Sequence, residues 1–232
     1  MSTIIRRLEE IRARMDAAAL KAGRNPGEVG LVAVSKTRSV EAVREAFDGG
    51  QAIFGENRVQ ELLAKAPLLP SALRWHLIGH LQKNKIRKVL PVVDLIHGVD
   101  TAELARDIDR IAAELGLFPR VLLEVNVSGE GTKFGFDPEV LREQIGELLA
   151  LPRVQVEGLM TIAPYAEEAE TARPFFVKLR ALRDEIAVKT ARPLPTLSMG
   201  MSGDFEVAIA EGSTLVRVGT AIFGDRGEIL SG

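Results

Sequence analysis

The chain has 232 residues, 46% apolar and 27% charged, which is enough for one sizeable hydrophobic core. Its 30 lysines and arginines against 32 acidic residues give a formal charge of −2, so charge gives no reason to expect nucleic acid or an anionic membrane as a partner. The absence of cysteine excludes disulfides, thiolate metal sites and cysteine nucleophiles. Residues 1–21 lack the apolar core of a signal peptide, and no run of about 18 apolar residues is present. A cytoplasmic protein is therefore expected.

The first expected element is an amphipathic helix. Ser2 or Thr3 can cap its amino terminus, and Gly23 lies just past its expected end. Arginines and glutamates separate the apolar residues that recur at helical spacing, which are Ile4, Ile5, Leu8, Ile11 and Met15.

After this helix a unit repeats in which a short apolar run, a polar tip and an amphipathic helical segment follow one another. The expected strands are residues 31–36, 51–55, 74–79, 95–99, 121–127, 154–160, 196–201 and 215–219. The expected helices are residues 39–48, a segment ending near 65, residues 83–90, a segment through 115, a segment opening at 138, and residues 167–188 and 205–210.

Eight strand–helix units at a spacing of roughly 25 residues predict an α/β fold, a single (β/α)8 TIM barrel near the lower size limit of that architecture. A doubly wound open sheet is the competing arrangement. The barrel is preferred because eight units are its closure number and no Pro/Gly-rich linker divides the chain. Residues 1–232 are thus expected to form one domain with an extra N-terminal helix, with little left over for a second domain.

The fifth expected strand shows which residues would face the barrel interior. Leu122, Glu124 and Asn126 share one face, and Asn126 would reach the mouth of the barrel. The opposite face, expected to pack on helices, carries Val121, Leu123, Val125 and Val127.

In such a barrel the carboxyl ends of the strands and the loops after them meet at one rim. Lys36 follows the first strand, and a lysine partly desolvated there can lose its proton and attack a carbonyl. The helix start at Ser202-Gly203 and the backbone and hydroxyl of Gly219-Thr220 together predict an anion cradle. Loops after strands seven and eight are the recurrent phosphate site of this fold.

Arg217 lies two residues before Gly219, on the same face of the last strand. A guanidinium buried there must have a partner. One interpretation is a salt bridge to Glu124 inside the barrel, and the other is a hydrogen bond to a ring nitrogen of a flat ligand. The two are compatible.

A reactive amine, a phosphate cradle and a ring-nitrogen partner are the three parts that a pyridoxal 5'-phosphate site needs. The rival reading of the same residues is a Schiff-base aldolase acting on a sugar phosphate, which needs the same lysine and cradle. An absorption band of a bound cofactor, lost in Lys36→Ala, would exclude the aldolase.

The sequence also resembles the pyridoxal phosphate homeostasis proteins, a single-domain group related to the barrel domain of alanine racemase. The matching segments fall in order along nearly the whole chain: VSKT at 34–37, FGENRVQE at 54–61, WHLIGHLQKNK at 75–85, GLMT at 158–161, LSMGMS at 197–202 and VRVGTAIFG at 216–224. The resemblance implies an alanine racemase N-terminal-domain-like barrel that holds the cofactor as a Schiff base on Lys36.

The resemblance also assigns roles to other rim residues. An arginine at the pyridine nitrogen, in place of a carboxylate, keeps the ring unprotonated and a weaker electron sink. The implied roles are phosphate binding for Ser202, Gly203, Gly219 and Thr220, contact with the pyridine nitrogen for Arg217, a place in the pocket for Asn57, and packing beside the ring for Met199 or Met201.

The implied function is pyridoxal 5'-phosphate binding in intracellular vitamin B6 homeostasis, without strong catalytic turnover. The alternative is a pyridoxal-phosphate-dependent amino-acid racemase, which needs a base on each face of the ring. Lys36 could serve one face, but in alanine racemase the opposite base is a tyrosine supplied across a dimer that involves its second domain. The only tyrosine here, Tyr165, follows the sixth strand without a clear route to that face. A binding protein is therefore preferred over an enzyme.

The expected partners are pyridoxal phosphate itself and, as candidate recipients, apoenzymes that depend on it; a monomer is expected. His76 and His80, four residues apart, suggest metal ligands, but no carboxylate motif accompanies them, so no metal site is expected. The basic run over residues 83–88 is expected to be a solvated helix face.

Overall fold

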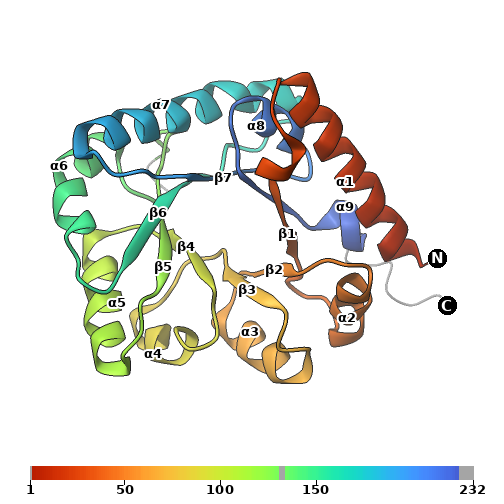
Figure 1. Cartoon of the computed structure of the whole chain (residues 1–232), viewed down its shortest axis with the longest axis horizontal. Helices are drawn as coiled ribbons and strands as arrows, with labels where there is room; N and C mark the ends of the chain where they lie inside the picture. Colours follow the sequence, from red (N-terminus) through yellow and green to blue (C-terminus); the bar gives the residue numbers. More distant parts are fainter. Residues whose placement is uncertain (1, 131–133, 225–232) are drawn as a thin grey trace.

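The computed structural model describes residues 2–130 and 134–224. Within them, eight parallel strands close into a barrel in which strands consecutive in sequence are neighbours and the last pairs with the first (Figure 1). The strands are β1 (Gly30–Val34), β2 (Ile53–Glu56), β3 (Arg74–Leu77), β4 (Leu95–Val99), β5 (Arg120–Glu124), β6 (Gln155–Met160), β7 (Thr196–Met201) and β8 (Leu215–Val218). The predicted (β/α)8 barrel is confirmed.

Helices follow the strands and surround the barrel (Figure 1). The α-helices are α1 (Thr3–Lys21), α2 (Val40–Asp48), α3 (Val59–Lys65), α4 (Ile86–Val89), α5 (Ala102–Leu115), α6 (Pro138–Leu149), α7 (Arg173–Thr190), α8 (Phe205–Ala210) and α9 (Thr220–Phe223). Short 3₁₀ turns are η1 (Pro26–Glu28), η2 (Ala66–Leu68), η3 (Lys83–Lys85) and η4 (Ala169–Ala172). No described helix has a stretch of the length and apolarity that a membrane span requires.

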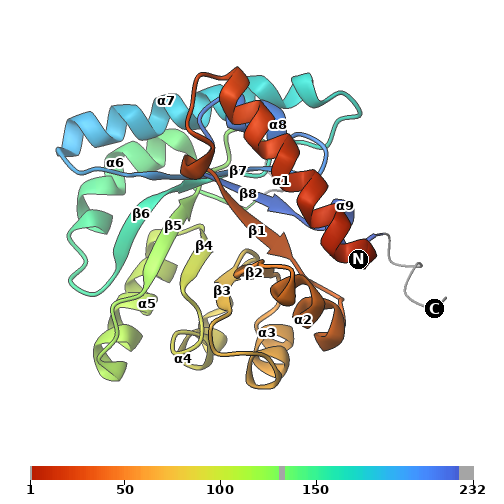
Figure 2. The same ribbon diagram turned by 45° about the vertical axis from the view of Figure 1, so that its right-hand side comes forward.

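The expected extra N-terminal helix is α1. Ser2 caps it, because its hydroxyl accepts a hydrogen bond from the backbone N–H of Ile5 at 3.2 Å. The buried stripe of α1 packs against α2, α8 and α9, so the helix covers the outside of the barrel where β8 meets β1 (Figures 1 and 2). That stripe consists of Leu8, Ile11, Met15 and Ala19.

The predicted helix over residues 83–90 divides into η3 and α4, and two other elements depart from the predicted bounds by three residues or more. β5 ends at Glu124 rather than at 127, because the chain turns to pair with Phe136, whose N–H donates to the Glu124 carbonyl at 2.8 Å. The long helix after β6 begins at Arg173 rather than at 167, preceded by the turn η4.

The residues of β5 alternate between two packing layers as expected. Its predicted outer residues belong to the large cluster between sheet and helices, whereas Leu122 packs in the barrel interior with Leu95 and Met160. The apolar residues of the interior thus form small groups, and polar residues at inward positions near the rim are the ones that a ligand at the mouth would meet.

Candidate functional site

Lys36 lies two residues beyond the end of β1. Val32 and Val34 point into the barrel interior, so the alternation of the strand directs Lys36 to the carboxyl-terminal mouth, the rim where the strands end. Its side chain is half-buried. Among the described residues it makes no hydrogen bond or ion pair. The side chain of Lys36 is therefore available to a ligand.

A buried ion pair supports the loop that carries Lys36. Lys65 Nζ donates to Glu56 Oε1 and to the Ser35 carbonyl, both at 2.8 Å, and to Glu61 at 2.7 Å. The Ser35 hydroxyl donates to the same Glu56 oxygen at 2.7 Å. Burial raises the pKa of the Glu56 carboxyl, while Lys65 and Ser35 oppose that rise. Glu61 also accepts the backbone N–H of Thr37, which has a left-handed φ of 63°.

The two predicted halves of the anion cradle lie together. The backbone N–H of Gly219 donates to the Ser202 hydroxyl at 3.3 Å, which joins the loop after β7 to the loop after β8. In the described part of the chain, the amides of Ser202 and Gly203 donate to no protein acceptor. The position of a Cβ on Gly203 has no atom within 4 Å, so space lies open above these amides. Thr220 is exposed at the start of α9.

Arg217 is buried beside this cradle, with 4% of its surface exposed. Its Nη1 donates to the Ser198 hydroxyl at 2.6 Å and its Nη2 to the Thr161 carbonyl at 2.9 Å. The sequence-based salt bridge with Glu124 is not formed in the described structure, although Glu124 and Asp204 raise the pKa of Arg217 electrostatically. Burial outweighs them and lowers that pKa to about 10.

Two acidic residues, Glu124 and Asp100, lie close together at the mouth, and Glu124 is near Arg217. Burial and, to a smaller extent, the nearby Asp100 raise the pKa of Glu124 to about 7, against the opposing effects of Arg217 and His80. His80 Nδ1 lies 2.9 Å from Asp100 Oδ2, and its ring stacks on Phe134 with centroids 4.5 Å apart. One carboxyl at this mouth therefore changes charge near neutral pH.

Asn57 and the methionines of β7 are the remaining residues predicted to contact the cofactor, and the structure places them differently. Asn57 follows β2 and is half-buried, and its carbonyl lies 2.3 Å from where a Cβ on Gly79 would be, so only glycine allows the two loops to approach so closely. Of the two methionines predicted beside the ring, Met199 is fully buried among the helix-facing residues, next to the inward-facing Ser198, whereas Met201 is partly exposed at the end of β7. The side chain of Met199 does not reach the mouth.

One other expectation is corrected by local geometry. Asn126 does not extend into the mouth, because its side chain donates to the Glu130 carbonyl and accepts from the Ser128 hydroxyl, both at 2.9 Å. His76 and His80 do not share a site, since His76 bonds His97 inside the barrel. Tyr165 is 94% exposed.

Sequence reasoning missed two buried groups, the ion pair of Lys65 and Glu56 and an interior chain of His76, His97 and Ser198. Glu56, His76 and His97 are buried despite their polarity. The sequence of a single strand does not predict this. A signal existed only in the inward parity of His76 and His97 on neighbouring strands.

The fold and the mouth together define a class of protein. It is a (β/α)8-barrel protein with a lysine amine, an open cradle of backbone N–H groups and a buried guanidinium on one rim. These residues fit pyridoxal phosphate, because the unpartnered Ser202 and Gly203 amides suit a phosphate and the half-buried Lys36 suits an aldehyde.

Comparison with known proteins gives the family. Residues 7–227 match the family described as alanine racemase, N-terminal domain. The chain is 48% identical over 221 residues to the pyridoxal phosphate homeostasis protein of Aquifex aeolicus, covering 95% of this chain and 97% of that protein. It is 43% identical over 232 residues to the protein of that name from Escherichia coli, covering 97% and 98%. The chain belongs to the family of pyridoxal phosphate homeostasis proteins.

Solved structures agree with this assignment. PipY of Synechococcus elongatus with pyridoxal phosphate bound is 42% identical, with a TM-score of 0.85, and the match covers 95% of this chain and 100% of that one. An alanine racemase of Clostridium difficile, 17% identical with a TM-score of 0.76, shares the fold; the match covers 99% of this chain but 58% of the racemase.

Proposed function

We propose that this protein binds pyridoxal 5'-phosphate at the carboxyl-terminal mouth and takes part in intracellular vitamin B6 homeostasis without strong catalytic turnover. The observation that carries the proposal is the half-buried amine of Lys36, which has no partner in the described structure and shares a rim with Arg217 and the open cradle. The cofactor bound to the 42% identical PipY supports it.

Each rim residue then has one task. When bound, the cofactor supplies an aldehyde that reacts reversibly with an amine. Lys36 provides that amine, and Ser202, Gly203, Gly219 and Thr220 hold the phosphate. Arg217, always a donor, faces the ring nitrogen and keeps it unprotonated.

The test is an absorption spectrum of the purified protein after incubation with pyridoxal phosphate and removal of the excess. The wild type should retain a band that Lys36→Ala loses. Lys88→Ala, which removes an exposed lysine of α4 away from the rim, is the matched control and should keep the band. Equal retention by Lys36→Ala and the wild type would refute the role of Lys36.

The racemase alternative makes a different prediction. Tyr165 is exposed to solvent rather than directed into the mouth, and the close relatives are named homeostasis proteins. Addition of amino acids to the loaded protein in deuterium oxide should therefore give at most slow exchange of the α-proton. Exchange at enzyme-like rates would establish the racemase.

The single domain over residues 1–232, the monomeric state, the cytoplasmic location and the recipient apoenzymes remain predictions. A monomer should sediment with the mass of one chain. Transfer should appear as activation of an apoenzyme by the loaded protein while a scavenger removes free cofactor.

A further inference from the structure

A chain of polar side chains crosses the barrel interior from the mouth described above to the opposite end. Arg217 Nη1 lies 2.6 Å from Ser198 Oγ, which lies 2.9 Å from His97 Nδ1. His97 Nε2 lies 2.9 Å from His76 Nδ1. The exposed fraction is 0% for Ser198 and His97 and 2% for His76, so these contacts are shielded from bulk solvent. We call this chain the relay.

The protons of the relay can be ordered in one direction. Arg217 can only donate, so Ser198 accepts from it and its own hydroxyl donates to His97 Nδ1. His97 then carries its proton on Nε2 and donates to His76, which carries its proton on Nε2. In the reverse order the Ser198 hydroxyl proton has no acceptor among the described residues, and a bare His76 nitrogen faces the Asp94 carboxylate at 3.8 Å. The first order leaves a single unmatched group, the Nε2–H of His76.

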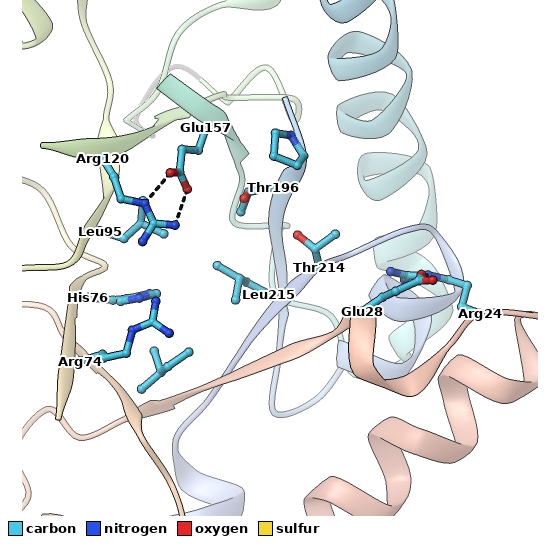
Figure 3. Close-up of a pocket in the computed structure, with 12 residues that line it drawn as sticks. Arg24, Glu28, Arg74, His76, Leu95, Arg120, Glu157, Thr196, Thr214 and Leu215 are labelled. Atoms are coloured by element: carbon cyan, nitrogen blue, oxygen red, sulfur yellow. Dashed lines mark hydrogen bonds and ion pairs between the residues drawn. The ribbon is translucent and has the colours of Figure 1, made fainter. Parts of the chain in front are cut away.

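That N–H lies at a cavity of about 380 Å³ at the amino-terminal end of the barrel, where the strands begin (Figure 3). The first residues of β3, β5 and β7 line it together with His76. The nearest acceptor, Asp94 Oδ2, lies 3.8 Å from His76 Nε2, beyond hydrogen-bonding distance, and already takes two N–H groups of Arg74 at 2.7 and 2.9 Å and one of Arg120 at 3.4 Å. A buried donor without an acceptor costs about 1–3 kcal/mol, so a ligand that supplies an acceptor gains that energy.

We propose that this cavity is a second ligand site, for a small carboxylate, and that its occupancy reaches Arg217 through the relay. The link to Arg217 rests on the proposed function, whereas the site itself does not. A carboxylate has two acceptor oxygens, one for His76 Nε2–H and one for Arg74 Nη1, which makes no hydrogen bond among the described residues. Arg120 also lines the cavity, where both oxygens of Glu157 hold its guanidinium (Figure 3).

The relay suits such a signal because its histidines stay neutral. Burial lowers the pKa of His97 well below its usual value, and the charge of Arg217 lowers it further. Burial also lowers the pKa of His76 and outweighs the nearby Asp94 carboxylate, which raises it. An anion that accepts from His76 makes its other nitrogen a better acceptor for His97, and the effect passes to Ser198, whose oxygen then holds Arg217 more tightly. The hydrogen bond that Arg217 offers to the ring nitrogen of the cofactor changes in strength as a result.

The first test uses the cofactor-free protein, whose three histidines simplify the spectrum. Two-bond ¹H–¹⁵N spectra should show protonated Nε2 and unprotonated Nδ1 for both His76 and His97. Protonated Nδ1 on either residue would overturn the relay.

The second test uses sodium acetate as the probe, titrated against sodium chloride at constant ionic strength. The ¹⁵N and ¹H signals of His76 should shift and saturate, while those of His80, at the other mouth, should not. Arg74→Gln should raise the apparent dissociation constant for acetate by about tenfold. A shift of His76 that is absent or never saturates would overturn the site, whether or not the protein binds pyridoxal phosphate.

The third test uses the loaded protein and follows the absorption band of the cofactor during the same titration. The band should shift in the wild type and not in Ser198→Ala. Ser213→Ala is the matched control, because Ser213 is an equally buried serine that donates to backbone carbonyls outside the relay, and it should respond like the wild type. If Ser198→Ala does not fold, Ser198→Cys replaces it. A wild-type band that stays fixed while His76 shifts would overturn the coupling.

Discussion

Lys65 Nζ and Glu56 Oε1 lie 2.8 Å apart, with 6% of Lys65 and none of Glu56 exposed, directly behind the loop that carries Lys36. The pair is the only ionic anchor of that loop among the described residues that reaches the Ser35 carbonyl. It explains how Lys36 can keep its amine unpartnered, because a different lysine neutralises the nearby carboxylates.

Replacement of Lys65 by methionine should lower the free energy of unfolding by about 3–5 kcal/mol, because it leaves the buried Glu56 without its cation. Urea unfolding measures the loss. Lys88→Met, on the exposed face of α4, should change stability by no more than about 0.5 kcal/mol. The double variant Lys65→Met with Glu56→Gln should recover more than half of the loss, since the amide can still accept from Ser35. A loss below about 1 kcal/mol for Lys65→Met would contradict a stabilising role.

Glu124 should make the cofactor-free protein less stable as the pH rises. Its pKa of about 7 in the folded state lies above the unfolded value of 4.5, so between these values the folded protein keeps a proton that the unfolded chain has lost. One pKa unit corresponds to about 1.4 kcal/mol, so roughly 3 kcal/mol is lost across this window and none beyond it. The groups that face Glu124 and set this value are Asp100, Arg217 and His80.

Glu124→Gln has no titrating carboxyl at this position, so its stability is the reference for the wild type at each pH. The stability of the wild type relative to Glu124→Gln should fall between pH 4.5 and 7 and stay level from pH 8 to 9. Denaturant titrations at each pH measure this difference, in which the other titrating groups cancel. A constant difference over the whole range would show that Glu124 has an ordinary pKa.

Much of the fold was predictable from local patterns, because each strand is a short apolar run followed at once by a polar rim residue. Lys36, Ser202, Gly219 and Arg217 were predicted as site residues in this way, and their positions follow from the ends of β1, β7 and β8 alone. The orientation of Met199 could not be predicted because the bonds of Ser198, which decide which residues of β7 face inward, come from β4 and β8.

The buried polar groups could not be predicted because they form only when distant strands meet. His97 and Ser198 are 101 residues apart in sequence and bond across the interior at 2.9 Å. Lys65 reaches Ser35 from the end of a helix, 30 residues along the chain. No local spacing encodes either contact, since both depend on closure of the barrel and on which helix packs behind which loop.

Gly203 offers a way to separate phosphate binding from stability. It has no positive φ, and an added Cβ meets no protein atom within 4 Å, so Gly203→Ala should change the free energy of unfolding by no more than about 0.5 kcal/mol. The same methyl group would occupy the cradle and should weaken pyridoxal phosphate binding at least tenfold, about 1.4 kcal/mol. Gly146→Ala, at an equally open position within α6, should gain up to about 1 kcal/mol of stability with unchanged affinity. Equilibrium dialysis and urea unfolding of the two variants measure both quantities, and unchanged affinity in Gly203→Ala would place the phosphate elsewhere.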